Sequence, residues 1–378
     1  MRIAIDTREL LDRPTGVGRY LAELLARWTR DASLARHELV LLSPRRPPAR
    51  RPWIGAGGAA ARDIEVPGGS GSRWEQTALA SAANLQRPDV FFAPGYTVPL
   101  RVRCPVVVAV HDVSFAAHPE WFRWREGLRR RLLTRWSARK ARRVITLSAF
   151  SRDEIVRHLG VAPEKIAVTP LAVDSHPALQ EATARASDAA RDEVAEAGSS
   201  RMVLYVGSIL ERRHLPELVA AFARVAPRVP AATLEIVGDN RTHPRINLNA
   251  LASALGAGHR VRVRDYVDDA TLAALYGRAR AFAFLSEYEG FGLPPLEAMQ
   301  AGVPAIVLDT PVSREVYGDA ALRIDLASPS SLDEALVSLL EDDAIRRRQL
   351  EASALLRSRY TWDTTARQTM DILQEAAH

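Results

Sequence analysis

The chain has 378 residues, of which 47% are hydrophobic and 25% charged, a composition that excludes a fibrous or intrinsically disordered protein. This length exceeds one typical core, so two domains are expected. The net charge of +6 divides unevenly, because residues 1–175 hold 29 basic and 17 acidic residues (+12), whereas residues 176–378 hold 22 and 28 (−6). Two domains with different partners are therefore expected.

No apolar run approaches the roughly 20 residues that cross a bilayer. The first residues, MRIAID, enter a strand pattern at once, so no signal peptide is expected. The single cysteine, Cys104, cannot form an internal disulfide, which is typical of a reducing compartment. The sequence therefore predicts a cytoplasmic protein.

Short apolar, β-branched runs alternate with helix-like stretches along both halves of the chain, which predicts parallel strands covered on both faces by helices. Because the pattern occurs twice, we expect two doubly wound α/β domains that face each other across a cleft. Residues 44–75, rich in Pro, Gly and Arg, are predicted to be mobile loops. The predicted strands are residues 2–6, 38–43, 89–94, 105–112, 143–148 and 165–170, then 202–208, 232–238, 261–267, 281–286, 304–309 and 321–326.

These runs place the first domain in residues 1–175 and the second in residues 201–357. Residues 176–200 contain no strand pattern and are rich in Ala and charge, which predicts a helical linker. In sheets of this kind, ligands bind beyond the carboxyl ends of the strands. The residues that follow each strand are therefore the candidates for function.

Two candidates follow strands of the first domain. Gly16 precedes an amphipathic helix, where a bare backbone and a helix N-terminus favour an anion, although a plain tight turn is the alternative. His111 ends the buried run VVVAVHD, where a neutral imidazole can hydrogen-bond a sugar hydroxyl or a developing charge. A structural hydrogen bond is the alternative for His111.

The segment YVGSILERRHL opens the second domain in the same manner. The predicted strand ends at Ser208, and Arg212 and Arg213 come shortly after it. Guanidinium groups match phosphate oxygens with two parallel hydrogen bonds. A phosphate site is one interpretation of these arginines, and a solvated surface is the other.

The segment SEYEGFGLPPLEAM places two carboxylates, Glu289 and Glu297, around a glycine-rich turn that leads into a helix. The turn is expected to present the amides of Phe291, Gly292 and Leu293 beside a positive helix terminus. Glu297 is expected in the first helical turn, where it can accept hydrogen bonds from a ribose diol. Glu289 stands before the turn, near where the sugar of a bound nucleotide-sugar would lie. A helix cap is the alternative.

The block SEYEGFGLPPLEAMQAGVPAIV resembles the E-x7-E signature of the GT4 family of retaining glycosyltransferases, which have the GT-B fold. The segments TGVGRYLAELL, VVVAVHDVSF, YVGSILERRHL and VRVRDYVDDATLAALYGRARAF are similar to other parts of that family, so the likeness covers nearly the whole chain. YTWDTTARQTMDIL, within residues 358–378, resembles the terminal helix that returns to the first domain.

The resemblance implies roles for the matching residues. Glu297 would bind the ribose, and Glu289 with the backbone of residues 291–293 would hold the donor sugar. Gly16 would approach the diphosphate and His111 the sugar hydroxyls, while Ser208, Arg212 and Arg213 would lie at the diphosphate. His111, Glu289 and Arg213 are the expected catalytic residues. The family usually has lysine where Arg213 stands and often arginine where Ser208 stands, so the charge is kept but its geometry differs.

The similar members are bacterial polysaccharide mannosyltransferases, which implies mannose transfer from GDP-mannose to a saccharide or polyprenyl-linked saccharide. A UDP-sugar-dependent transferase and a nucleotide-sugar epimerase are the alternatives, and a non-enzymatic protein with a degenerate pocket is a third. A phosphorylase is disfavoured because both lysines, Lys140 and Lys165, lie in the first half of the chain, away from the second domain that would hold pyridoxal phosphate. No D-x-D motif occurs, so a metal-held diphosphate is not expected. The resemblance implies no other cofactor.

Residues 121–143 contain ten basic residues and one acidic residue, Glu126. Trp124, Leu128, Leu132 and Trp136 recur every four residues along one stripe. The stripe predicts either a core-facing helix with a solvated basic face or a helix that lies on anionic lipid at the inner face of the membrane. No nucleic-acid recognition motif accompanies the charge, so nucleic acid is not an expected partner.

Overall fold

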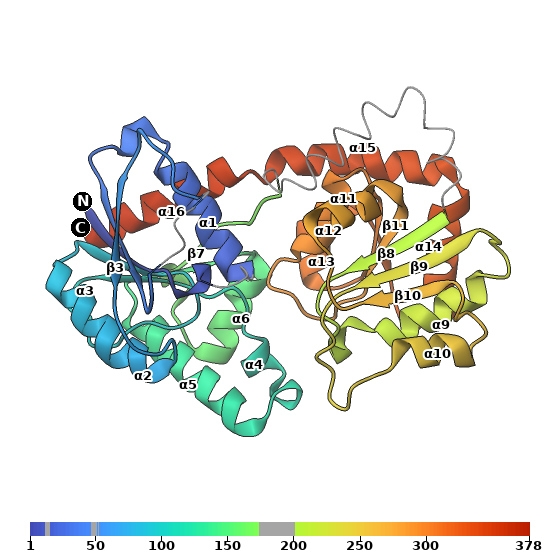
Figure 1. Cartoon of the computed structure of the whole chain (residues 1–378), viewed down its shortest axis with the longest axis horizontal. Helices are drawn as coiled ribbons and strands as arrows, with labels where there is room; N and C mark the ends of the chain where they lie inside the picture. Colours follow the sequence, from blue (N-terminus) through green and yellow to red (C-terminus); the bar gives the residue numbers. More distant parts are fainter. Residues whose placement is uncertain (12–15, 47–50, 52, 174–200) are drawn as a thin grey trace. The chain divides into compact units, whose positions relative to one another are not determined.

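The computed structural model describes residues 1–11, 16–46, 51, 53–173 and 201–378. The chain is divided into unit 1, Met1–Leu171 with Trp362–His378, and unit 2, Ala172–Thr361 (Figure 1). The predicted linker, residues 176–200, lies outside the described residues.

Unit 1 is built on a parallel sheet of order β3-β2-β1-β4-β5-β6-β7. The strand order reverses between β1 and its neighbour β4, which marks the switch point of a doubly wound sheet. The strands are β1 (Arg2–Asp6), β2 (Glu38–Ser43), β3 (Ala60–Glu65), β4 (Val90–Ala93), β5 (Val106–Ala109), β6 (Arg143–Thr146) and β7 (Ile166–Val168). The helices are α1 (Gly16–Trp28), α2 (Ser72–Trp74), α3 (Ala80–Gln86), α4 (Ser114–Ala117), α5 (Trp124–Lys140), α6 (Ala149–Leu159) and α16 (Trp362–Ala377).

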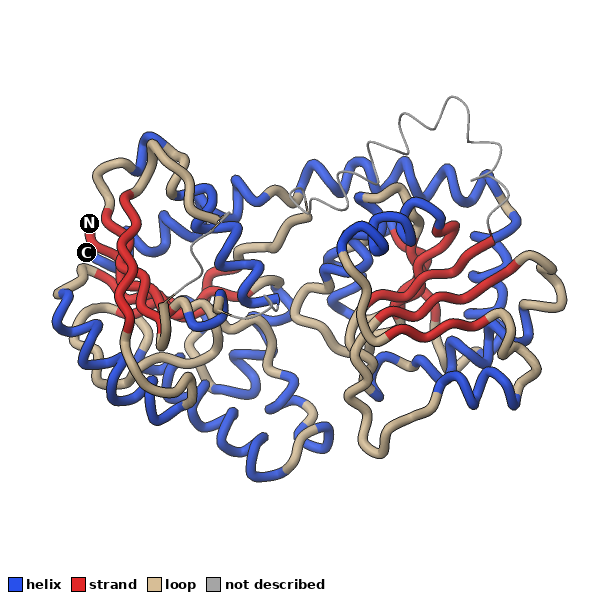
Figure 2. The backbone as a smooth tube through the Cα atoms, viewed as in Figure 1, coloured by secondary structure: helices blue, strands red, loops and turns tan. Residues whose placement is uncertain are grey.

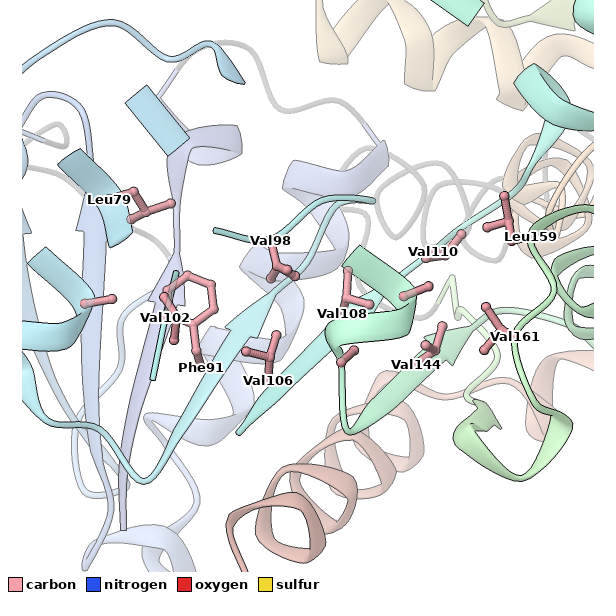
Figure 3. Close-up of a cluster of buried hydrophobic side chains, with 14 of the residues drawn as sticks. Leu79, Phe91, Val98, Val102, Val106, Val108, Val110, Val144, Leu159 and Val161 are labelled. Carbon is pink, nitrogen blue, oxygen red and sulfur yellow. The ribbon is translucent and has the colours of Figure 1, made fainter. Parts of the chain in front are cut away.

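Successive residues of a strand point to opposite sides of the sheet. Helices cover both faces of this sheet, so side chains of both sets are buried. Phe91 joins a buried cluster with residues of α3, α5 and α6, and Figure 3 shows its valine-rich centre. Phe92 points to the other face, where its ring packs edge-on against Tyr20 and Trp28 of α1. The hydrophobic stripe of α1 predicted from the sequence is thus buried as expected.

The C-terminal helix α16 packs on the same face of unit 1 as α1. The indole nitrogen Nε1 of Trp28 donates a 2.9 Å hydrogen bond to the carbonyl of Ala366. Thr365 donates a 2.6 Å hydrogen bond from its hydroxyl to the carbonyl of Pro170. The last residues of the chain therefore complete the domain formed by the first ones, whereas residues 358–361 belong to unit 2.

Unit 2 is built on a second parallel sheet, of order β10-β9-β8-β11-β12-β13. Its strand order reverses between β8 and β11. The strands are β8 (Arg201–Val206), β9 (Ala232–Val237), β10 (Val261–Arg264), β11 (Ala279–Phe284), β12 (Ala305–Leu308) and β13 (Ala321–Ile324). The helices are α9 (Leu215–Val225), α10 (Leu248–Ala254), α11 (Asp269–Arg278), α12 (Leu293–Gln300), α13 (Pro311–Val316), α14 (Pro329–Glu341) and α15 (Asp343–Arg359).

In unit 2, helices again lie on both faces of the sheet (Figures 1 and 2). Helix α9 packs against α10 and α14, while α12 packs against β11, β12 and α15. Both units are therefore doubly wound, Rossmann-like α/β domains, as the alternating sequence pattern predicts.

Each run predicted as a strand forms one, usually shortened by one or more residues at its carboxyl end. The prediction of loops for residues 44–75 is wrong in part, because this segment contains β3 and α2. Strand β3 lies at the edge of the sheet and alternates between exposed and half-buried residues, with Arg62 and Asp63 in its middle. An edge strand needs no continuous apolar run, so it escapes a search for such runs.

Candidate active site

The switch point of the unit 2 sheet is flanked by the residues that follow β8 and β11. After β8 the chain passes through Gly207 and Ser208 into a 3₁₀ turn, Glu211–Arg213. After β11 it passes through Ser286 and Glu289 into α12. Because β8 and β11 are neighbours in the sheet, these two loops lie at the same edge, and the amide of Glu287 donates to the carbonyl of Arg212 (3.0 Å).

Arg213 and Glu289 form an ion pair across this switch point. The guanidinium donates from Nη2 and Nε to Oε1 of Glu289, at 2.9 and 3.2 Å. Its Nη1 donates to the carbonyl of Ser208 at 2.9 Å. Its central carbon lies 4.9 Å from the ring centroid of Phe284, in a cation–π contact. These partners fix both the position and the plane of the guanidinium.

The surroundings of Arg213 keep it charged. Burial by itself lowers its pKa, but Glu289 and the hydroxyl of Tyr205 together outweigh burial, so the pKa lies above its ordinary value. Tyr205 donates from its hydroxyl to the carbonyl of Ser208 at 2.8 Å, and burial raises the pKa of this phenol. The edge of the sheet therefore holds a permanent cation beside a neutral hydroxyl group.

The glycine-rich turn depends on one residue, Gly292, at the N-cap of α12. Its φ is +90°, and a Cβ atom there would lie 2.0 Å from the hydroxyl of Tyr317. That hydroxyl donates to the carbonyl of Gly292 at 2.6 Å. Both the backbone angle and the close approach require glycine.

The start of α12 supplies amide donors, as the sequence predicts. No side chain caps this helix. Within the described part of the chain, the amides of Phe291, Gly292 and Leu293 donate to no other backbone group. Since unpaired amides at a helix N-terminus attract anions, the turn is suited to a phosphate or a sugar oxygen.

One expectation about this helix is wrong. Glu297 was predicted in its first turn, but α12 starts at Leu293, which makes Glu297 the fifth residue of the helix. The helix includes the residue before the two prolines, because proline is tolerated throughout the first turn of a helix. Glu297 is half-buried in this position.

In unit 1, the candidate His111 lies at the carboxyl edge of the sheet, just beyond β5. Its Nε2 lies 2.7 Å from the carbonyl oxygen of Pro94, which can only accept, so Nε2 is the protonated nitrogen. Burial lowers the pKa of His111, which favours the neutral ring. The rings of Tyr20 and Tyr96 lie 5.2 and 5.7 Å from it.

Gly16, the other unit 1 candidate, is the exposed first residue of α1. A Cβ atom added there would meet nothing within 4 Å, so no described protein atom requires a glycine. The next residue, Val17, faces Gly95 in the loop after β4, and Pro94 of the same loop binds His111. Gly16 and His111 are thus brought to one edge of the unit 1 sheet.

The structure adds residues that sequence reasoning missed. Ser286 donates from its hydroxyl to Oε1 of Glu289 at 2.9 Å, and Tyr317 supports the turn from 25 residues away. Phe284 and Tyr205 hold Arg213 from within strands. The S-x-x-E spacing of Ser286 and Glu289 was a local signal for the first contact, whereas Tyr317 carried none.

Two kinds of feature are absent from the described residues, a metal-binding cluster and a membrane-spanning helix. No group of three or more His, Cys, Asp or Glu side chains in the described ranges could hold a metal ion. No helix in this part of the chain is both long and apolar enough to cross a bilayer. The expectation that no metal or other cofactor takes part stays a prediction.

The fold and the site together define a two-domain α/β protein whose second sheet has an edge suited to an anion. Two family models match the chain in succession, described as Glycosyltransferase Family 4 over residues 14–176 and Glycosyl transferases group 1 over residues 186–355. The chain belongs to this glycosyltransferase family and has its GT-B fold.

Individual relatives agree with the family models. O-antigen chain mannosyltransferase B of Escherichia coli is 27% identical over 282 residues, covering 75% of this chain and 73% of its own. Glycogen synthase of Mycobacterium tuberculosis is 27% identical over 300 residues, covering 76% and 68%. Among solved structures, Anabaena HepE in complex with UDP-glucose has a TM-score of 0.72 at 17% identity, covering 99% of this chain and 100% of that one.

Proposed function

We propose that this glycosyltransferase moves mannose from GDP-mannose, with retention of configuration, to a saccharide or polyprenyl-linked saccharide in surface polysaccharide synthesis. The observation that carries this proposal is the Arg213–Glu289 pair beside the open N-terminus of α12. The similarity to an O-antigen chain mannosyltransferase supports the choice of sugar. We place the enzyme in the cytoplasm, at the inner face of the membrane.

The residues of unit 2 have distinct tasks in this proposal. Glu297 accepts hydrogen bonds from the ribose hydroxyls, and Ser208, Arg212 and Arg213 lie at the diphosphate. Glu289 and the amides of Phe291, Gly292 and Leu293 hold the sugar and its bridging phosphate. Because the guanidinium of Arg213 and the turn amides are held in place before the substrate arrives, they stabilise negative charge without reorganisation.

The reaction begins when the bond between the sugar C1 and the phosphate oxygen breaks and its electron pair passes to the diphosphate. Arg213 and the turn amides stabilise the negative charge that develops there. The acceptor hydroxyl then attacks the same face of the oxocarbenium-like sugar, and its proton passes to the leaving phosphate. We assign His111, whose ring is neutral, to a hydrogen bond with the sugar hydroxyls. We assign the backbone at Gly16 to the diphosphate.

A second donor class is a specific alternative. HepE, which shares the fold, was solved with UDP-glucose, and this favours a UDP-sugar for the same arrangement. A nucleotide-sugar epimerase is a further alternative, which incubation of the enzyme with donor alone would reveal as isomerised sugar.

A thermal-shift screen with GDP, UDP, ADP and dTDP tests the donor. A ligand at 100 times its Kd stabilises the folded protein by about 2.7 kcal/mol, and we expect GDP to give the largest rise in Tm. A larger rise in Tm with UDP would show that the donor is a UDP-sugar. No rise with any nucleotide would contradict the proposal. NMR of the product formed with and without a chelator then tests retention of configuration and independence of metal.

A further inference from the structure

Helix α5 of unit 1 presents its largest apolar side chains to solvent. Trp124, Leu128 and Trp136 are 70%, 49% and 48% exposed. Together with the half-buried Leu132, they recur every four residues and form one stripe along the helix. This arrangement contradicts the core-facing interpretation of the stripe and leaves the surface interpretation.

The opposite face of α5 shows why the stripe is not in the core. Its buried residues are all small, namely Gly127, Thr134, Ser137 and Ala138. Ser137 accepts a 3.0 Å hydrogen bond from the amide of Val98, and Ala138 joins the valine-rich cluster. The helix thus packs against the rest of unit 1 through small side chains, so its packing does not need the tryptophans.

Basic residues flank the exposed stripe. Arg125, Arg129, Arg139 and Lys140 are all exposed. The single acidic residue of the helix, Glu126, is paired with Arg130 at 2.6 Å. Arg125 also lies over the ring of Trp124, 5.2 Å from its centroid, so cation and indole share one patch.

This combination fits an anionic lipid surface. Tryptophan rings partition to the boundary between headgroups and acyl chains, while neighbouring arginines pair with anionic phosphates. A neutral apolar partner would not require the cations, and a nucleic acid would not require an exposed leucine. The geometry points to the exposed face of α5, from Trp124 to Lys140, as a docking surface for anionic phospholipid. The inference relies on the proposed function only for its purpose, which is to bring the enzyme to a lipid-linked acceptor.

The test is co-sedimentation of the full chain with vesicles of phosphatidylcholine, with and without phosphatidylglycerol. We expect binding only to the anionic vesicles and its loss at high salt, because surface charges are screened within about 10 Å at 0.1 M ionic strength. The pair Arg125→Glu and Arg139→Glu should weaken binding by at least about tenfold. The pair Trp124→Ala and Trp136→Ala should also weaken it about tenfold.

Matched controls distinguish binding through this surface from non-specific adsorption to vesicles. Leu85, which is 78% exposed on α3, provides the apolar control Leu85→Ala, and exposed Arg101 provides the charge control Arg101→Glu. Both controls should bind as the unchanged protein does. Equal binding to neutral vesicles, equal loss in the controls, or unaltered binding of the α5 variants would overturn the inference, as would binding to nucleic acid in place of vesicles.

Calorimetric titration with GDP distinguishes this test from that of the proposed function. The α5 variants are expected to bind GDP as tightly as the unchanged protein, because α5 belongs to unit 1. Vesicle binding without any nucleotide binding would leave the docking surface standing and remove the proposed function.

Discussion

The two sheets end in chemically opposite edges, although both are parallel and doubly wound. At the edge of the unit 2 sheet, a charged guanidinium is held by a carboxylate, a carbonyl and an aromatic ring. At the edge of the unit 1 sheet, a neutral imidazole is held by a carbonyl and enclosed by two tyrosine rings. The same topology thus provides one edge suited to anions and one suited to hydroxyl groups.

The two edges differ in the charge of the side chain that each one holds, because Arg213 is charged and His111 is neutral. Burial acts against the charged form of both side chains. At Arg213, Glu289 and Tyr205 together outweigh burial and raise the pKa, whereas at His111 burial prevails and lowers the pKa. A diphosphate needs the first environment, and sugar hydroxyls need only the second. Substitutions that alter either edge therefore test whether the two edges differ in this way.

The largest effect is expected from Gly292→Ala, which breaks the unit 2 turn. The positive φ and the 2.0 Å approach to Tyr317 together should lower the free energy of unfolding by on the order of 3 kcal/mol. Gly302→Ala, at φ +75° with nothing within 4 Å, provides the control and should cost about 1 kcal/mol. Equal losses in urea unfolding would show that the contact with Tyr317 does not matter.

Arg213→Ala removes the cation from the unit 2 edge and leaves Glu289 without its charged partner, although Ser286 still donates to it. Breaking a fully buried pair costs about 3–5 kcal/mol, and because Glu289 is 21% exposed we expect about 2 kcal/mol here. Donor binding should be lost as well. Arg224→Ala breaks a more exposed pair with Asp333 and should cost under about 1 kcal/mol without affecting the donor.

His111→Gln tests the neutral edge through pH. The lowered pKa means that the unfolded chain binds a proton near pH 6.5 while the folded chain does not, so stability is lost as pH falls below that value. The slope from this residue is at most about 1.4 kcal/mol per pH unit. We expect the variant to lose this part of the slope in unfolding measured from pH 7 to pH 5, and an unchanged slope would contradict the assignment.

The smallest effect is expected from Tyr205→Phe. The variant loses the 2.8 Å hydrogen bond to Ser208, whose carbonyl still accepts from Arg213. The cost should be about 1 kcal/mol, measured by urea unfolding. A much larger loss would mean that the tyrosine, and not Glu289, orients Arg213.

The sequence predicted the parallel strands well because each buried strand carries its own apolar run. It did not predict β3, whose exposed edge needs no such run. The sequence also did not predict the pairing of Arg213 with Glu289. The two residues are 76 positions apart and meet only because β8 is next to β11 in the sheet. The stripe of α5 was seen, but its periodicity did not reveal that the small residues, and not the large ones, face inward.

In the proposed function, unit 2 binds the nucleotide of the donor, with Glu297 on its ribose. Calorimetric titration of GDP into the unchanged protein, Glu297→Ala and the control Glu334→Ala tests this role, because Glu334 is an exposed carboxylate of the same unit. We predict binding to the unchanged protein and to the control, and no measurable binding to Glu297→Ala. Equal affinity in all three would show that Glu297 does not bind the ribose.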